Sequence, residues 1–304
     1  MEKNGILNVY KEPGFTSFDV VAKLRGIAGQ RKIGHTGTLD PMATGVLPVC
    51  LGKATKVCGL LTDWDKEYEA ELLLGRETDT LDVTGEVLRS TPVSVSETQV
   101  REAFSRFEGG YDQVPPMYSA LKVDGKRLYD LARKGVTVER QSRPVKLYEL
   151  EILEMALPVV RFRVLCSKGT YIRSLCADIG EVLGCGGCMQ SLVRTKVGPF
   201  FLSDARKLSE IEARKADLTG LLRSVDALFP DLPQMRVTPE GERFLKNGNR
   251  LEAKDFVLSE DAAAFFSSQT ASGAGIRVYD AAGAFAALYE YDRKAGNYKV
   301  RTMF

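Results

Sequence analysis

The segment from Gly34 to Gly45 constrains this chain most, because it places polar groups between glycines and a proline inside an apolar region. It reads Gly-His-Thr-Gly-Thr-Leu-Asp-Pro-Met-Ala-Thr-Gly and contains the only histidine of the 304 residues. Its glycines permit sharp turns and close approach of a ligand, and Pro41 biases Asp40 away from helical geometry. An ordinary turn, in which the carboxylate accepts local backbone hydrogen bonds, is the alternative. The glycines and Pro41 predict a stiff loop that holds the Asp40 carboxylate in one pose, and the apolar flanking residues indicate that it joins buried elements.

The same segment resembles the active-site motif of the TruB-type pseudouridine synthases, the bacterial family that modifies the T loop of tRNA. That motif reads close to G-H-T-G-x-L-D-P-x-A-T-G, and the chain matches every fixed position. Further blocks resemble the family in the same order: Gln-Val-Pro-Pro-Met-Tyr-Ser-Ala-Leu-Lys at 113–122, Cys-Ser-Lys-Gly-Thr-Tyr-Ile-Arg at 166–173, and Leu-Val-Arg at 192–194. So long a match is highly specific, and it extends from residue 5 to residue 230.

Length and composition are those of an ordinary globular protein with two domains. The chain has 304 residues, of which 44% are hydrophobic and 27% charged, and such a length allows about two domains of ~150 residues. A proline-rich stretch at 229–233 predicts the boundary. The resemblance implies an α+β fold, with a mixed, mainly antiparallel central sheet flanked by helices in a catalytic domain at 1–230. For 231–304 it implies a small C-terminal β-barrel, an RNA-binding domain of the PUA type.

Hydrophobic patterning predicts the main elements of this fold. Strands are expected at 6–10, 45–51, 68–74 and 159–166, and helices at 17–29, 96–107 and 170–183. Short β-like pieces follow the boundary, near 236–238, 276–279, 286–291 and 298–303. Residues 111–146 lack a steady period, so we expect them to leave the core with one short helix near 128–134.

Composition also bears on compartment and metals. Charges interrupt every apolar run and no charged-then-apolar leader opens the chain, so we expect a cytoplasmic protein with no membrane span. Cys185 and Cys188 form a Cys-x-x-Cys pair, but there is no second pair and the single histidine lies far away in sequence. A zinc site is therefore poorly supported, and we expect reduced thiols and no metal.

Charge is concentrated rather than large. The chain carries a formal net charge of +2, whereas residues 122–146 contain eight basic and three acidic side chains. A local basic excess is typical of a surface that binds polyanions, although a solvated helix face has a similar composition. The resemblance implies that 111–146 is the family's insertion that clamps the T stem-loop of tRNA through phosphate contacts. The candidate clamp residues are Lys122, Lys126, Arg127, Arg133, Lys134 and Arg143.

The activity implied by the resemblance is isomerisation of a uridine. The C1′–N1 glycosidic bond breaks, the uracil turns, and C5 joins C1′. Nothing is oxidised or hydrolysed, so no cofactor or metal is needed and one carboxylate suffices. Asp40 matches the essential aspartate of the family. Attack on C1′, attack on the base and removal of a ribose proton remain alternative roles for it.

The resemblance assigns seven further residues to the substrate site. Tyr68 matches the aromatic residue that stacks on the target base, and Arg173 the arginine that pairs with the catalytic aspartate. His35 matches the residue that fills the space left when the base is extruded. The remaining matches are Tyr171, Leu192 and Lys56, which line the pocket or serve only packing, and Asp82, for which a turn role is an equal alternative.

Three other functions compete with this interpretation. A nucleoside N-glycosylase would use Asp40 and Asp82 as a carboxylate pair and release free uracil. An RNA-binding or chaperoning protein would not need Asp40 at all. The archaeal-eukaryotic branch of the family works on guided RNA. We expect a stand-alone enzyme that acts on the T-loop uridine at position 55 of tRNA, as a monomer without an obligate protein partner.

Overall fold

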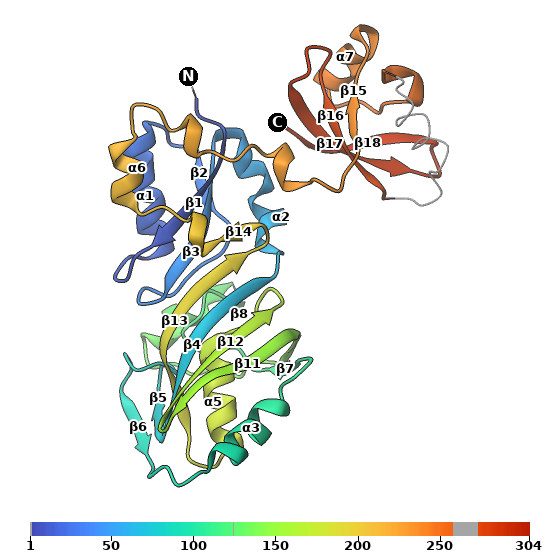
Figure 1. Ribbon diagram of the computed structural model, residues 1–304. Helices are drawn as coiled ribbons and strands as arrows, with labels where there is room; N and C mark the ends of the chain where they lie inside the picture. Colours follow the sequence, from blue (N-terminus) through green and yellow to red (C-terminus); the bar gives the residue numbers. More distant parts are fainter. Residues whose placement is uncertain (1, 124, 258–272) are drawn as a thin grey trace.

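The computed structural model describes residues 2–123, 125–257 and 273–304 (Figure 1). Within these ranges eight strands form one large sheet, whose main path runs β1-β3-β13-β4-β12-β11. Neighbours on this path are antiparallel except β3 and β13, which are parallel. The strands are β1 (Gly5–Lys11), β3 (Thr44–Leu51), β13 (Gly187–Val197), β4 (Lys66–Leu74), β12 (Val159–Cys166) and β11 (Leu147–Ala156), with β2 (Ile33–His35) on β3 and β14 (Phe200–Phe201) on β13. The predicted mixed, mainly antiparallel central sheet is confirmed.

Helices cover the two ends of this sheet separately (Figure 1). Helices α1 (Ser17–Ala28) and α6 (Leu208–Ala213) pack over β1 and β3, whereas α3 (Glu97–Ser105) and α5 (Ile172–Val182) pack over β4 and β12. Thr16 caps α1 in a capping box with Asp19, as the sequence predicts for Thr16 or Ser17. The short helical segments are η1 (Gly52–Val57), α2 (Cys58–Thr62), η2 (Leu202–Asp204), η3 (Thr219–Leu221) and η4 (Asp226–Leu228). In the described part of the chain, no helix is both long and apolar enough to span a bilayer.

One transverse row of the sheet joins the two ends. Strand pairing aligns Lys11 with Gly45, Gly45 with Arg194, and Arg194 with Tyr68. Gly45 has a φ of +104°, and a Cβ there would lie 2.2 Å from the Arg194 carbonyl oxygen. Only glycine combines this backbone conformation with so close a neighbour. The last glycine of the motif segment therefore permits the parallel contact between β3 and β13.

The predicted insertion begins and ends in a small two-stranded sheet, separate from the large one. β7 (Tyr111–Gln113) at its start pairs with β10 (Arg143–Val145) at its end. Between them lie the two-residue strands β8 (Lys122–Val123) and β9 (Lys126–Arg127) and the helix α4 (Leu128–Ala132). A further hairpin, β5 (Arg76–Thr78) and β6 (Val87–Ser90), leaves the end of β4.

The C-terminal part forms a separate small sheet beside the large one (Figure 1). Its order is β15-β16-β17-β18, with β15 (Gln234–Arg236), β16 (Gly275–Tyr279), β17 (Phe285–Asp292) and β18 (Asn297–Met303). Helix α7 (Pro239–Lys246) and η5 (Ala253–Asp255) cover it. Phe285 and Phe304 pack against the apolar cluster around α2 of the large body. The described C-terminal residues therefore form a small four-stranded sheet.

The row through Gly45 leads to a stability prediction. We expect Gly45→Ala to lower the free energy of unfolding by more than about 2 kcal/mol, because the added Cβ collides with the β13 backbone. Gly14 is the matched control, since it also has a positive φ (+82°), but a Cβ added there would meet no described residue beyond its chain neighbours within 4 Å. Gly14→Ala should cost about 1 kcal/mol. Urea denaturation of both variants measures the difference, and equal losses would contradict the account of the row.

Candidate active site

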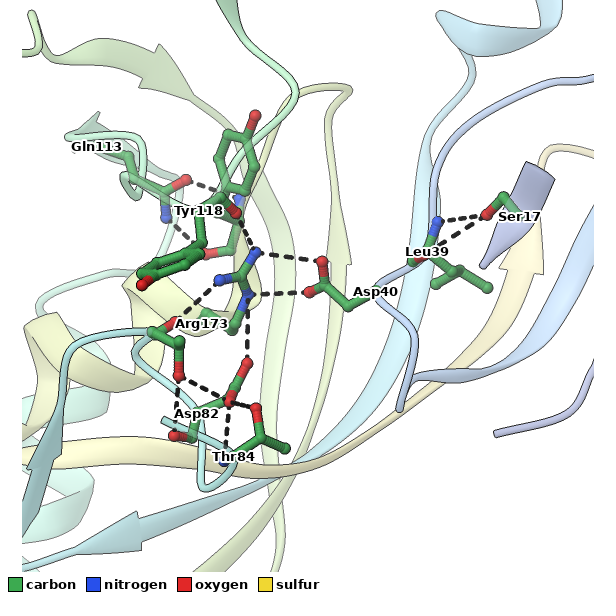
Figure 2. Close-up of polar contacts among 10 residues, drawn as sticks. Ser17, Leu39, Asp40, Asp82, Thr84, Gln113, Tyr118 and Arg173 are labelled. Atoms are coloured by element: carbon green, nitrogen blue, oxygen red, sulfur yellow. Dashed lines mark hydrogen bonds and ion pairs between the residues drawn. The ribbon is translucent and has the colours of Figure 1, made fainter. Parts of the chain in front are cut away.

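The loop that carries Asp40 is fixed on both sides of that residue. The Leu39 amide donates to Ser17 Oγ at 2.9 Å, which attaches the loop to the start of α1 (Figure 2). After Asp40, the Pro41 carbonyl accepts from the Gly14 amide at 2.9 Å and from Lys11 Nζ at 2.9 Å. Hydrogen bonds to the main chain of Leu39 and Pro41 thus hold Asp40 in place, as the stiff loop predicted from the glycines and proline requires.

The Asp40 carboxylate faces the guanidinium of Arg173, which comes from the first turn of α5 (Figure 2). Arg173 Nε donates to Asp40 Oδ2 at 2.9 Å and Nη2 donates to Oδ1 at 3.2 Å. The Arg173 side chain is only 6% exposed, whereas that of Asp40 is 36% exposed. The bidentate pair therefore holds the carboxylate from its buried side and leaves part of it open to a ligand.

Main-chain carbonyls accept from two further N–H groups of Arg173. Nη1 donates to the Thr80 carbonyl at 2.8 Å, and Nη2 also donates to the Tyr118 carbonyl at 2.8 Å. Thr80 belongs to the hairpin after β5 and Tyr118 to the insertion, so segments far apart in sequence converge on one guanidinium. Such a planar fork can satisfy all these acceptors only in one orientation.

Asp82 approaches the same Nε of this arginine. Its Oδ2 is 3.9 Å from Arg173 Nε, while Oδ1 accepts from Thr80 Oγ1 at 2.9 Å and from the Thr84 amide at 2.9 Å. The neighbouring Leu81 adopts a positive φ of 61°, an uncommon conformation for a residue with a side chain. Both alternatives for Asp82 are thus represented in its contacts: it stabilises a turn and it faces the site arginine.

Tyr68 is buried beside Arg194, its partner in the transverse row. The Tyr68 residue is 8% exposed and Arg194 is 1% exposed. Burial raises the pKa of the Tyr68 hydroxyl, and the positive charge of Arg194 opposes that rise. Arg194 Nε donates to the Val46 carbonyl at 2.7 Å and Nη2 to the Gly37 carbonyl at 3.5 Å, so this cation bonds to the motif segment and to the strand that follows it.

His35 ends β2 at the entrance to the motif segment. Burial, and secondarily the charge of Arg194, lower the pKa of the His35 imidazole, so it is neutral at pH 7. Its Nδ1 accepts from the Gly37 amide at 3.3 Å, which places the proton on Nε2. A neutral, oriented ring of this kind suits stacking on a base.

Comparison with known proteins shows the family of this chain. Residues 25–172 match the model of the TruB family pseudouridylate synthase N-terminal domain, and residues 173–229 match that of the tRNA pseudouridylate synthase B C-terminal domain. The chain is 51% identical to tRNA pseudouridine synthase B of Lachnoclostridium phytofermentans over 99% of both proteins. It is 50% identical to the protein of that name from Alkaliphilus oremlandii, over 82% of this chain and 83% of the relative. This chain belongs to the TruB family of pseudouridylate synthases.

This TruB-family chain is therefore an isomerase, and the fold agrees with that assignment. It superposes on a subunit of a Cbf5-Nop10-Gar1 complex with a TM-score of 0.72 and 27% identity, over 98% of this chain and 84% of that one. A second similar structure is an H/ACA ribonucleoprotein bound to a substrate RNA containing 2′-deoxyuridine, with a TM-score of 0.70 and 25% identity, over 99% of this chain and 84% of that one. Those two chains extend beyond the region that aligns with this TruB-family protein.

Two further predicted site residues of this TruB-family chain lie at the start of α5 and on β13. Tyr171 immediately precedes α5, and burial raises the pKa of its hydroxyl. Leu192 lies on β13 opposite Ala70 of β4 and is 8% exposed. Both side chains come from the elements that also carry Arg173 and Arg194.

Lys56 lies elsewhere. It follows the end of β3 remote from Asp40, is exposed, and its Nζ donates to the Met303 carbonyl at 2.7 Å. The structure thus places it where the C-terminal sheet meets the large body, and it does not bring this side chain to the ion pair. The predicted clamp cations all lie on the insertion and are exposed: Lys122, Lys126, Arg127, Arg133, Lys134 and Arg143.

Lys11 is a site residue that sequence reasoning missed. It is fully buried at the end of β1, and its Nζ donates to the Pro41 and Ala43 carbonyls of the Asp40 loop at 2.9 and 2.6 Å. Burial lowers the pKa of Lys11 to about 8, although the charge of Asp40 opposes the shift. A lysine at the end of a strand gives no sequence signal of burial, because such side chains are almost always exposed.

This lowered pKa gives a pH-dependent prediction. The unfolded lysine binds a proton up to its ordinary pKa of 10.5, whereas the folded one loses it above about 8. The unfolded state then binds more protons between these values, so the contribution of Lys11 to stability rises with pH. The free energy of unfolding of the wild type, relative to Lys11→Met, should therefore increase by about 1 kcal/mol or more between pH 7.5 and 9.5.

Urea denaturation at the two pH values measures this difference. Lys53→Met is the control, because Lys53 is exposed, and its difference from the wild type should not change with pH. A Lys11→Met difference that is equally constant would contradict the buried placement of the amine.

Proposed function

We propose that this chain converts the uridine at position 55 in the T loop of tRNA to pseudouridine. The relatives that it resembles are named tRNA pseudouridine synthase B, which supports tRNA as the substrate. The observation that carries the proposal is the Asp40–Arg173 pair, in which a partly exposed carboxylate is held in a bidentate contact by a buried arginine. The proposed reaction breaks the C1′–N1 bond, turns the uracil and forms the C5–C1′ bond, with loss of the C5 proton and gain of a proton at N1.

Asp40 is the catalytic residue in this proposal. The reaction needs one carboxylate within reach of C1′, the base or a ribose proton, and the exposed part of Asp40 provides it. Arg173 orients that carboxylate, and the fixed main chain on both sides limits its movement. Tyr68 stacks on the target base, and Tyr171, Leu192 and Asp82 complete the wall of the site. Lys56, remote from the ion pair, is left out of this wall.

Access to the base requires that it leave the folded tRNA. The target uridine is buried in the tRNA elbow, so the enzyme has to extrude it into the site. The neutral imidazole of His35, held at the entrance to the motif segment, fills the vacated space by stacking. Keeping water away from the opened glycosidic bond prevents loss of the base by hydrolysis.

RNA binding is assigned to the cations of the insertion, the clamp residues named above. Their position on the surface lets them meet phosphates, and the two-stranded base formed by β7 and β10 attaches them to the sheet. A similar structure is described as bound to a substrate RNA, which supports this use of the fold. In this proposal 1–230 is the catalytic domain, 231–304 is a PUA-like RNA-binding domain, and the enzyme acts as a cytoplasmic monomer without a protein partner.

The proposal predicts a sharp effect of Asp40→Asn on turnover. With tRNA transcripts that carry tritium at uracil C5, the wild type should release tritium, and Asp40→Asn should lower the rate at least ~10³-fold because the carboxylate is lost. Affinity for the transcript should stay within about threefold, because the phosphates supply most of the binding free energy. In both proteins affinity should fall steeply as salt rises.

Two controls separate the competing functions. A transcript with cytidine at position 55, and tritium at the remaining uridines, should release nothing if that position is the target. Chromatography of the products should show no free uracil, whereas free uracil would indicate an N-glycosylase. Binding without tritium release from any tRNA would support an RNA-binding or chaperoning protein instead.

A further inference from the structure

Gln113 is a buried polar side chain that the proposed chemistry does not use. It ends β7, at the start of the insertion, and is 1% exposed. Both functional groups of its amide are bonded: Oε1 accepts from the Tyr171 amide at 2.7 Å, and Nε2 donates to the Tyr171 carbonyl at 3.0 Å. One side chain of the insertion therefore holds the amide and the carbonyl of a single residue in the catalytic body (Figure 2).

The residue held in this way begins the helix that carries Arg173. Tyr171 is the N-cap of α5, and its own side chain makes no capping hydrogen bond. Its carbonyl also accepts the first bond inside the helix, from the Leu175 amide at 3.1 Å. A helix start without a side-chain cap is ordinarily free to fray. Gln113 supplies the missing restraint from outside the helix. It acts at Tyr171, which lies two residues before Arg173.

Further bonds tie the same two segments together. Ser174 Oγ donates to the Val114 carbonyl at 3.0 Å, and Arg173 Nη2 donates to the Tyr118 carbonyl at 2.8 Å. On the far side, Gln113 Nε2 donates to the Tyr111 hydroxyl at 2.7 Å, which in turn donates to Asp178 at 2.7 Å. The first arm of the insertion is thus bonded to α5 along its length, and Gln113 lies at the centre of these contacts.

From this geometry we infer that Gln113 is the positioning residue that couples the base of the insertion to the site arginine. By fixing both main-chain groups of Tyr171, it sets where α5 begins and so where the Arg173 guanidinium meets Asp40. Gln113 does not touch the proposed reacting atoms, and its effect passes through Tyr171 and Arg173. This inference rests on the proposed function, because it assigns Arg173 the task of orienting the catalytic carboxylate.

The test compares Gln113→Met with Tyr111→Phe. The first variant keeps the length of the side chain and removes both bonds to Tyr171. The second removes the Tyr111 hydroxyl, and with it the bonds to Asp178 and from Gln113 Nε2, and leaves both Tyr171 contacts of Gln113 intact. We expect Gln113→Met to lower the single-turnover rate of tritium release at least tenfold, since small displacements in a catalytic site have effects of roughly this size. Affinity for a T stem-loop RNA should stay within about threefold. Tyr111→Phe should change neither by more than about threefold, even if its melting temperature falls.

A second measurement does not depend on activity. In protein labelled with ¹⁵N-arginine, the Nε–H resonance of Arg173, assigned with Arg173→Lys, reports the bond to Asp40. We expect it to shift or broaden in Gln113→Met and to remain in place in Tyr111→Phe. If Gln113→Met does not fold, Gln113→Asn keeps the amide but is one methylene too short to reach both groups of Tyr171, and it should show the same changes.

The outcomes separate the inference from the function on which it rests. An unchanged Arg173 resonance or an unchanged rate in the folded Gln113 variants overturns the inference. So do losses in the Gln113 and Tyr111 variants that merely follow their melting temperatures. If the wild type releases no tritium, the proposed function fails, and the resonance still shows whether Gln113 positions Arg173.

Discussion

The bidentate contact between Asp40 and Arg173 is the interaction on which the rest of this site depends. It joins residues 133 positions apart in sequence, one in the loop between β2 and β3 and the other at the start of α5. A buried guanidinium without a carboxylate partner is costly, and a carboxylate without a fixed partner is free to rotate. The ion pair avoids both the unpaired guanidinium and the freely rotating carboxylate. Arg173 gains an anion, and Asp40 gains one orientation while part of it stays open to solvent.

Much of the surrounding structure fixes the positions of Asp40 and Arg173. The transverse row of Lys11, Gly45, Arg194 and Tyr68 crosses four strands, and two of its members are buried cations that bond to carbonyls of the motif segment and of the strand that follows it. From the other side, carbonyls of the β5–β6 hairpin and of the insertion orient Arg173. The site therefore depends on main-chain carbonyls held by the sheet, a rigid source of electrostatic orientation.

The sequence predicted the parts of this arrangement that have a local signal. The glycines and Pro41 indicated the stiff loop, the apolar period indicated α1, and alternation indicated β4 and β12. The meeting of Arg173 with Asp40 was expected only because both residues match a family motif. No local pattern in this sequence relates two positions so far apart.

The missed features have physical causes. β13, at the centre of the sheet, was not predicted because bulges near Ser191 and Lys196 interrupt its alternation, and because its buried Arg194 has the charge of a surface residue. β11 also contains bulges, and it exposes most of its side chains. Lys56 matched the family motif but lies at the contact with the C-terminal sheet. In each case tertiary contacts, which single-sequence patterns do not contain, decided the placement.

The measurement that tests the central claim most directly is the single-turnover rate of Arg173→Lys on a T stem-loop RNA. Lysine keeps the positive charge, but its ammonium cannot form the bidentate contact and reach the Thr80 and Tyr118 carbonyls together. The account predicts a rate at least ~10²-fold lower with affinity little changed. Arg161→Lys, which alters an exposed arginine–carboxylate pair on the sheet, should leave the rate unaltered. A rate for Arg173→Lys close to that of the wild type would contradict the account, because charge alone would then suffice.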